Sequence, residues 1–182
     1  VGQFNINNLE WTKSILAGIQ EAKSPAIIQT SEGAAKYMGG YKTVVNLVKD
    51  LYESMGITVP VALHLDHGTY EGAKKVIEAG YTSVMFDGSH FDFDDNVAIT
   101  RKVVEYAHER GVKVYVTVNI LARDTDLDKA EEYFKFLEKT GIDGAIVSDT
   151  GLIYLARTVA PNLNVNLSTQ ANTLNYKTVE FW

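Results

Sequence analysis

The segment His64–Gly68, with the sequence HLDHG, combines imidazole and carboxylate groups within five residues. It follows the apolar run 59–63, so these side chains are expected where a buried strand opens into a loop. An imidazole such as that of His67 is a preferred ligand of Zn²⁺, which needs at least three protein ligands when it is catalytic. The neighbouring Asp66 could give a proton to a substrate hydroxyl or take one from it.

The same segment also has a purely structural interpretation. His64 would then be a packed core residue, and Asp66 would cap the following helix through Thr69. The spacing alone fits both interpretations, and both stay open at this point.

A second group of this kind lies in the segment Phe86–His90, with the sequence FDGSH. Asp87 could be an additional cation ligand or an acceptor for a ligand's N–H group, and His90 could be a further ligand. The alternative is an Asp-Gly turn followed by the start of the next helix, which needs no ligand.

Polar side chains stand at the ends of nearly all the expected strands. They are Asn5, Asn7, Thr30, Ser31, Asp66, His67, Asp87, Ser89, Asn119, Ser148, Asp149, Ser168 and Gln170. In a barrel of parallel strands such positions share one rim, where active sites are built. Polar strand ends are also ordinary loop chemistry, so the pattern gains weight only from particular residues.

Short β-branched runs alternate with longer amphipathic stretches, which is typical of repeated βα units around a parallel sheet. Strands are predicted at 2–7, 25–30, 60–66, 82–88, 112–119, 143–148 and 163–168. Helices are predicted at 9–22, 40–55, 70–79, 94–110, 126–140, 150–159 and 173–182. This pattern predicts one α/β domain over residues 1–182, a TIM-barrel-derived (β/α) repeat of about seven parallel strands in a compact or incomplete barrel. A doubly wound sheet is the alternative, but no Gly-x-Gly-x-x-Gly turn follows any strand.

The amino-acid composition argues against some classes of function. The chain has 182 residues, a net charge of −6 and no cysteine, with an isoelectric point near 5.2. An acidic chain is not expected to bind nucleic acid or an anionic membrane, because both need a basic face. We see no apolar membrane span and no charged-then-apolar leader, and we therefore expect a cytoplasmic protein.

Several segments in residues 1–111 are similar to class II fructose-bisphosphate aldolases. They are Val1–Asn8, Ser31–Gly40, Ala62–Gly68, Ser83–His90 and Val103–His108, in the order of that family. The resemblance implies the first four strands of a barrel that cleaves a ketose bisphosphate with the help of Zn²⁺.

The resemblance also implies roles for particular residues. Asp66 would be the catalytic acid and base, His67 a zinc ligand and Asp87 a secondary cation ligand. His90 is added here as a further metal-ligand candidate. Asn7, Ser31 and Ser89 are the candidates for binding a sugar phosphate.

The sequence departs from the aldolase pattern at Val112. Residues 105–182 resemble the collagenase-like U-type peptidase family. The segments that carry this resemblance are Val114–Asn119, Gly144–Asp149 and Asn166–Asn172. Together the two resemblances imply an aldolase-like half at 1–111 and a peptidase-family-like half at 112–182, joined near 105–114. This suggests an engineered hybrid of two barrel families.

The predicted function is therefore a hybrid barrel scaffold without a complete active site. It rests on ligand counting, because no histidine follows His108 and Thr117 stands where the aldolase pattern calls for a carboxylate. The alternative is a weak zinc-dependent class II aldolase-like lyase acting on a ketose bisphosphate. A further alternative is a module that only binds a phosphate or a sugar. A barrel without its eighth strand would expose strand edges, which favours a homodimer.

Overall fold

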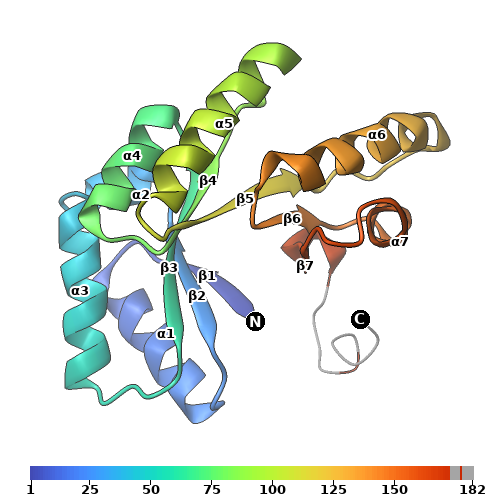
Figure 1. Cartoon of the computed structure of the whole chain (residues 1–182). Helices are drawn as coiled ribbons and strands as arrows, with labels where there is room; N and C mark the ends of the chain where they lie inside the picture. Colours follow the sequence, from blue (N-terminus) through green and yellow to red (C-terminus); the bar gives the residue numbers. More distant parts are fainter. Residues whose placement is uncertain (173–176, 178–182) are drawn as a thin grey trace. The chain divides into compact units, whose positions relative to one another are not determined.

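The computed structural model describes residues 1–172 and residue 177. The chain divides into two compact units, Val1–Val114 and Tyr115–Trp182. Parallel strands and helices alternate along both, as the ribbon in Figure 1 shows. The strands are β1 (Gly2–Asn5), β2 (Ala26–Thr30), β3 (Val61–Gly68), β4 (Ser83–Phe86), β5 (Lys113–Val118), β6 (Gly144–Val147) and β7 (Val165–Leu167).

The helices complete the alternation. They are α1 (Leu9–Glu21), α2 (Glu32–Tyr37), α3 (Tyr41–Ser54), α4 (Tyr70–Ala79), α5 (Phe93–His108), α6 (Asp124–Thr140) and α7 (Thr150–Val159), followed by the 3₁₀ turn η1 (Thr169–Ala171). The strands follow one another in chain order, and the pairing is parallel from β1 to β4 and from β5 to β7. The predicted fold class is confirmed: an α/β protein of TIM-barrel type, with seven strands in the described residues and an incomplete barrel.

Most predicted elements lie close to the observed ones, with one helix missed. Helix α2 is only six residues long and contains Gly33, so it shows no helical period in the sequence. Its start is fixed by Ser31, whose side chain accepts a hydrogen bond from the Ala34 backbone N–H at 3.1 Å. The predicted helix at 173–182 lies outside the described residues, apart from residue 177.

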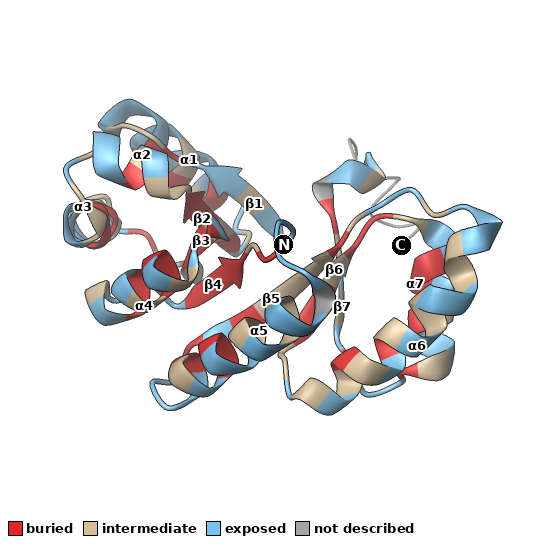
Figure 2. Ribbon diagram, turned by 90° about the horizontal axis from the view of Figure 1, so that it is seen from above, coloured by how far each residue is buried: buried red, intermediate tan, exposed pale blue. Residues whose placement is uncertain are grey.

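The first unit has its core between β2, β3 and β4 and the helices that cover them. Ile28, Leu65 and Val84 on these strands are 0% exposed, and so are Val44 of α3 and Val76 of α4. Figure 2 shows this as buried strands flanked by helices that are exposed on their outer faces. Long apolar runs such as that of β4, buried at all four residues, are typical of parallel strands covered by helices.

The second unit has a core of its own. Phe134 of α6, Ala145 and Val147 of β6, and Leu152 and Ala156 of α7 are fully buried within it. Gly141 ends α6 with a φ of 78°, a left-handed conformation that costs glycine little, and so the chain can turn directly into β6.

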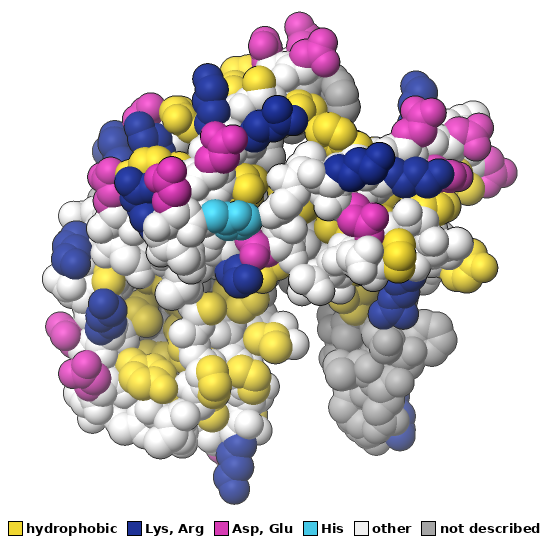
Figure 3. All heavy atoms as spheres, viewed as in Figure 1, with side chains coloured by type: hydrophobic (Ala, Val, Ile, Leu, Met, Phe, Trp, Pro, Cys, Tyr) yellow, Lys and Arg dark blue, Asp and Glu magenta, His cyan; other side chains and the backbone are white. Residues whose placement is uncertain are grey.

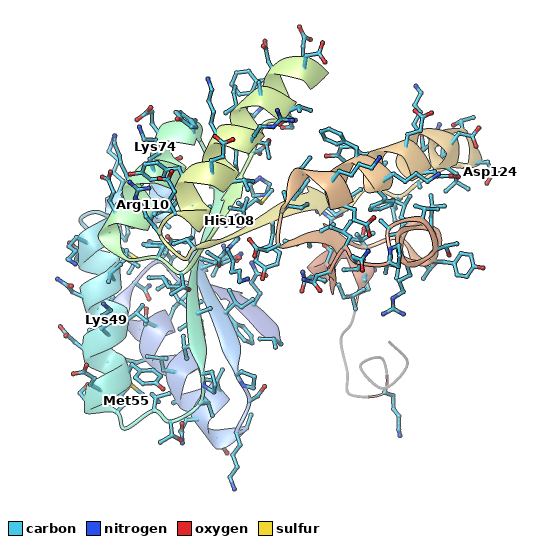
Figure 4. All side chains as sticks on the ribbon, viewed as in Figure 1. Lys49, Met55, Lys74, His108, Arg110 and Asp124 are labelled. Carbon is cyan, nitrogen blue, oxygen red and sulfur yellow. The ribbon has the colours of Figure 1, made fainter. Side chains whose placement is uncertain are left out.

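The outer faces of the helices carry charges of both signs. Figure 3 shows lysine and arginine beside aspartate and glutamate on the visible face. Lys74 of α4 and Arg110, just after α5, both lie over the ring of Tyr106, at 5.7 Å and 3.7 Å from its centre (Figure 4). The contact of Lys74 with Tyr106 helps to hold α4 against α5, whereas Arg110 stacks on a ring of the helix it follows. No helix in the described part of the chain is long and apolar enough to span a bilayer.

Candidate active site

The carboxyl end of β3 contains a β-bulge, and Asp66 and His67 lie within it. Leu65 pairs with Val84 and Gly68 with Phe86, so β3 has one more residue than β4 over this interval. The extra residue is accommodated at His67, whose φ is +51°. Such a conformation costs a residue with a side chain about 1–3 kcal/mol, and it persists only where neighbouring contacts hold it.

The His67 ring is held by a carboxylate of the neighbouring strand end. His67 Nδ1 lies 2.8 Å from Asp87 Oδ2, and His67 Nε2 lies 3.9 Å from Asp66 Oδ1. The hydrogen bonds from His67 and Ser89 lower the pKa of Asp87 to about 2. Asp87 therefore stays ionised at neutral pH and can accept a hydrogen bond from the imidazole when His67 Nδ1 carries the proton.

Asp66 is oriented by a row of amide side chains that crosses three strands. Gln29 Nε2 donates to Asp66 Oδ2 at 3.2 Å and to Asn5 Oδ1 at 2.6 Å. Gln3 in turn donates to Gln29 Oε1. The row fixes one carboxylate oxygen of Asp66 and leaves the side chain 24% exposed. Such a carboxylate can exchange a proton with a substrate hydroxyl.

Gln29 was missed as a functional candidate by sequence reasoning. It follows the three apolar residues that open β2 and is only 8% exposed. A buried amide needs partners, and this could have pointed to a polar row beside Asp66.

His64 is a packed core residue, as its structural interpretation predicts. Its side chain is 3% exposed, and Nδ1 lies 2.8 Å from Ser83 Oγ. Burial lowers its pKa from 6.5 to about 4, against the opposing effect of the Asp66 charge. His64 Nε2 finds no hydrogen-bond partner among the described residues. The proposed cap by Asp66 is not formed, because Thr69 itself caps α4 by accepting from Gly72 N–H at 3.0 Å.

The remaining candidates lie at this rim without forming one ligand set. Ser89 N–H donates to Asp87 Oδ1 at 3.1 Å, and Ser89 Oγ lies 3.3 Å from His90 Nδ1. Ser31 is occupied as the cap of α2, and Asn7 Oδ1 is buried with no hydrogen-bond partner in the described structure. The structure thus brings Asp66, His67, Asp87 and Ser89 into one connected group.

A metal ion is not fully provided for by these residues. Residues 1–172 and 177 contain no group of three or more histidine, cysteine, aspartate or glutamate side chains that could hold one. His67 offers one imidazole, and its Nδ1 is already paired with Asp87. A catalytic zinc ion needs three protein ligands, so the described residues do not fit a complete zinc site.

Known proteins similar to this chain are fructose-bisphosphate aldolases. Residues 1–158 match the family model described as fructose-bisphosphate aldolase class-II. The fructose-bisphosphate aldolase of Geobacillus stearothermophilus is 56% identical over 152 residues, covering 79% of this chain and 53% of that protein. The Streptococcus pneumoniae enzyme is 53% identical over 149 residues, covering 79% of this chain and 51% of its own length. This chain spans about half the length of the curated relatives it matches.

A solved structure agrees over a longer stretch. The YdjI aldolase from Escherichia coli K12 has a TM-score of 0.78 at 26% identity, over 100% of this chain and 70% of that chain.

These matches correct two expectations. The match to residues 1–158 runs across the supposed join at 105–114, and no comparison supports a peptidase-family half or an engineered hybrid. The predicted scaffold without a complete active site is also wrong, and the class II aldolase alternative fits better. The error came from judging the chain by the number of histidines available for one metal site. The family match instead depends on the sequence of residues 1–158 as a whole.

Proposed function

Because the chain belongs to the class II fructose-bisphosphate aldolase family, we propose that it acts in the aldol cleavage of a ketose bisphosphate. The observation that carries the proposal is the family match over residues 1–158, which includes the whole connected group around Asp66 and His67. The chain spans about half the length of the curated relatives it matches. The cleavage activity is therefore proposed for this chain.

Asp66 is proposed as the acid and base. Its carboxylate is fixed on one side by Gln29 and faces the rim on the other, so it can take the proton of a substrate hydroxyl as the carbon–carbon bond breaks. His67 is proposed as the imidazole ligand of the metal ion, and Asp87 fixes the orientation of its ring.

Asn7, Ser31 and Ser89 stay proposed contacts for the sugar phosphate. Each stands at or just after a strand end of the first unit, the region in which barrel enzymes bind their substrates. For Ser31, this role would use the hydroxyl that now caps α2, and a ligand would have to compete with that cap.

The metal belongs to the proposal as well. The described residues offer part of a ligand set: His67, with Asp87 and His90 as weaker candidates. A Zn²⁺ ion held there would supply Lewis-acid chemistry at the ketose carbonyl. A coupled assay of fructose 1,6-bisphosphate cleavage, run after chelation and again with added ZnCl₂, tests this. Cleavage that returns with zinc is the expected result, and the absence of cleavage under both conditions contradicts the proposal.

The cytoplasmic location and the homodimer stay predictions. Strand β1 stands at the end of the strand order and is exposed at three of its four residues, which favours pairing with a second copy. Light scattering behind a sizing column would show a dimer, and a monomer at all concentrations would contradict it.

A further inference from the structure

The strained turn at His67 is held by strand pairing before it and by a backbone hydrogen bond at Gly68 after it. Before it, β3 is paired with both neighbours up to Leu65. After it, Gly68 O accepts from Asp87 N–H at 2.9 Å. What fixes the chain beyond Gly68 decides whether the left-handed conformation of His67 is kept.

Glu32, at the start of α2, supplies this further anchor. Its Oε1 accepts two hydrogen bonds from one residue, from Thr69 N–H at 2.6 Å and from Thr69 Oγ1 at 2.8 Å. Thr69 lies two residues after His67, and its hydroxyl accepts in turn from Gly72 N–H. The carboxylate therefore ties the end of the bulge to the first turn of α4.

The Glu32 carboxylate occupies space that a side chain at position 72 would otherwise fill. A Cβ atom on Gly72 would lie 1.9 Å from Glu32 Oε1, so only glycine leaves room for the carboxylate. On another element, Tyr41 of α3 makes a side-chain hydrogen bond with Glu32, and burial together with this carboxylate raises the pKa of Tyr41. Glu32 thus touches residues of α3 and of the β3–α4 turn.

We propose that Glu32 is a positioning residue of the active site, which holds the left-handed turn at His67 by anchoring Thr69. The inference rests on the proposed function only in taking His67 as part of the working site. The hydrogen bonds that Glu32 makes to this turn both go to Thr69, and it therefore acts on His67 through the backbone between them.

The test is NMR of the whole chain with labelled histidine and a labelled backbone. Glu32→Ala should move the His67 Cα and ring signals and should speed hydrogen exchange of the Thr69 amide by roughly tenfold or more, because bonds to charged groups are strong. Glu32→Gln keeps an acceptor oxygen and should recover most of the His67 signals. Glu71→Gln, an exposed carboxylate in the first turn of α4, is the matched control and should leave His67 unchanged.

Gly72→Ala keeps the charge of Glu32 but pushes its carboxylate away, while alanine itself favours the helix. It should reproduce the His67 shift, and it provides the test if Glu32→Ala fails to fold. The proposal is overturned if Thr69 exchange quickens while the His67 signals stay in place, since Glu32 would then only cap α4. These signals do not depend on cleavage, so an inactive protein with a responsive His67 would refute the proposed function and leave this inference standing.

Discussion

The buried His64 should make the stability of the first unit depend on pH. We propose replacing it with asparagine, whose side chain can keep the contact to Ser83 Oγ but does not titrate between pH 4 and 7. The pKa of His64 is lowered by burial from 6.5 to about 4, so between these values the unfolded chain binds a proton that the folded chain does not. Folding is therefore fully stabilised above pH 6.5 and loses stability as the pH falls toward 4.

The size of the effect follows from the two pKa values. At about 1.4 kcal/mol for each pH unit between 6.5 and about 4, the loss in the free energy of unfolding is roughly 3 kcal/mol. Most of it should be present at pH 4.5. Other groups facing His64 are Ser83, which does not titrate, and Asp66, whose charge works against the lowering.

Urea unfolding at pH 7.5 and pH 4.5 measures this directly. The wild type should lose roughly 2–3 kcal/mol more than His64→Asn between the two pH values. His108→Asn, at the exposed end of α5, is the control and should follow the wild type. Parallel pH curves for the wild type and His64→Asn would refute the reasoning, because His64 would then titrate alike in both states.

Three further substitutions give expectations of their own. Gly68→Ala places a Cβ 2.2 Å from Leu65 Cδ2 and 3.1 Å from Met85 O, and overpacking of this kind should lower the free energy of unfolding by about 1–3 kcal/mol in urea titrations; a neutral result would contradict the packing at the bulge. Phe134→Ala, in the core of the second unit, should cost about 3–5 kcal/mol, and a loss below 1 kcal/mol in thermal unfolding would contradict that core. Gln29→Leu removes the hydrogen bond to Asp66, and it should lower kcat more than it raises KM; an unchanged kcat would show that the amide row is not needed for orientation.

Much of the fold could be predicted from the sequence because parallel strands covered by helices leave a strong apolar period. The strands β2 to β6 lie within a few residues of their predicted ranges, and the polar residues that follow them mark the rim. Helix α2 could not be found this way, since six residues with a central glycine carry no measurable period.

The geometry of the site was less accessible to sequence reasoning. Asp66 and His67 are predicted as site residues because acid and imidazole side chains stand together at a strand end, and their roles stay proposals. The bulge was not predicted, because its left-handed residue is a histidine and not the glycine that usually signals such a turn. Gln29 and Glu32 were missed because their partners lie 37 residues away in sequence, and only the folded chain brings them together.

The division of the chain stays a matter for experiment. The sequence predicted one domain with halves meeting near 105–114, and the structure has compact units on either side of Val114. Limited proteolysis followed by mass spectrometry would show whether the chain is cut there first.

The group around Asp66 is proposed to belong to a working aldolase. The most direct measurement follows fructose 1,6-bisphosphate by ³¹P NMR with the wild type, with Asp66→Asn and with Asp50→Asn, an exposed carboxylate of α3. We predict two triose phosphates in equal amounts from the wild type and from Asp50→Asn, and a rate at least about 100-fold lower for Asp66→Asn. An unchanged substrate spectrum with the wild type, or equal rates for the wild type and Asp66→Asn, would contradict the account.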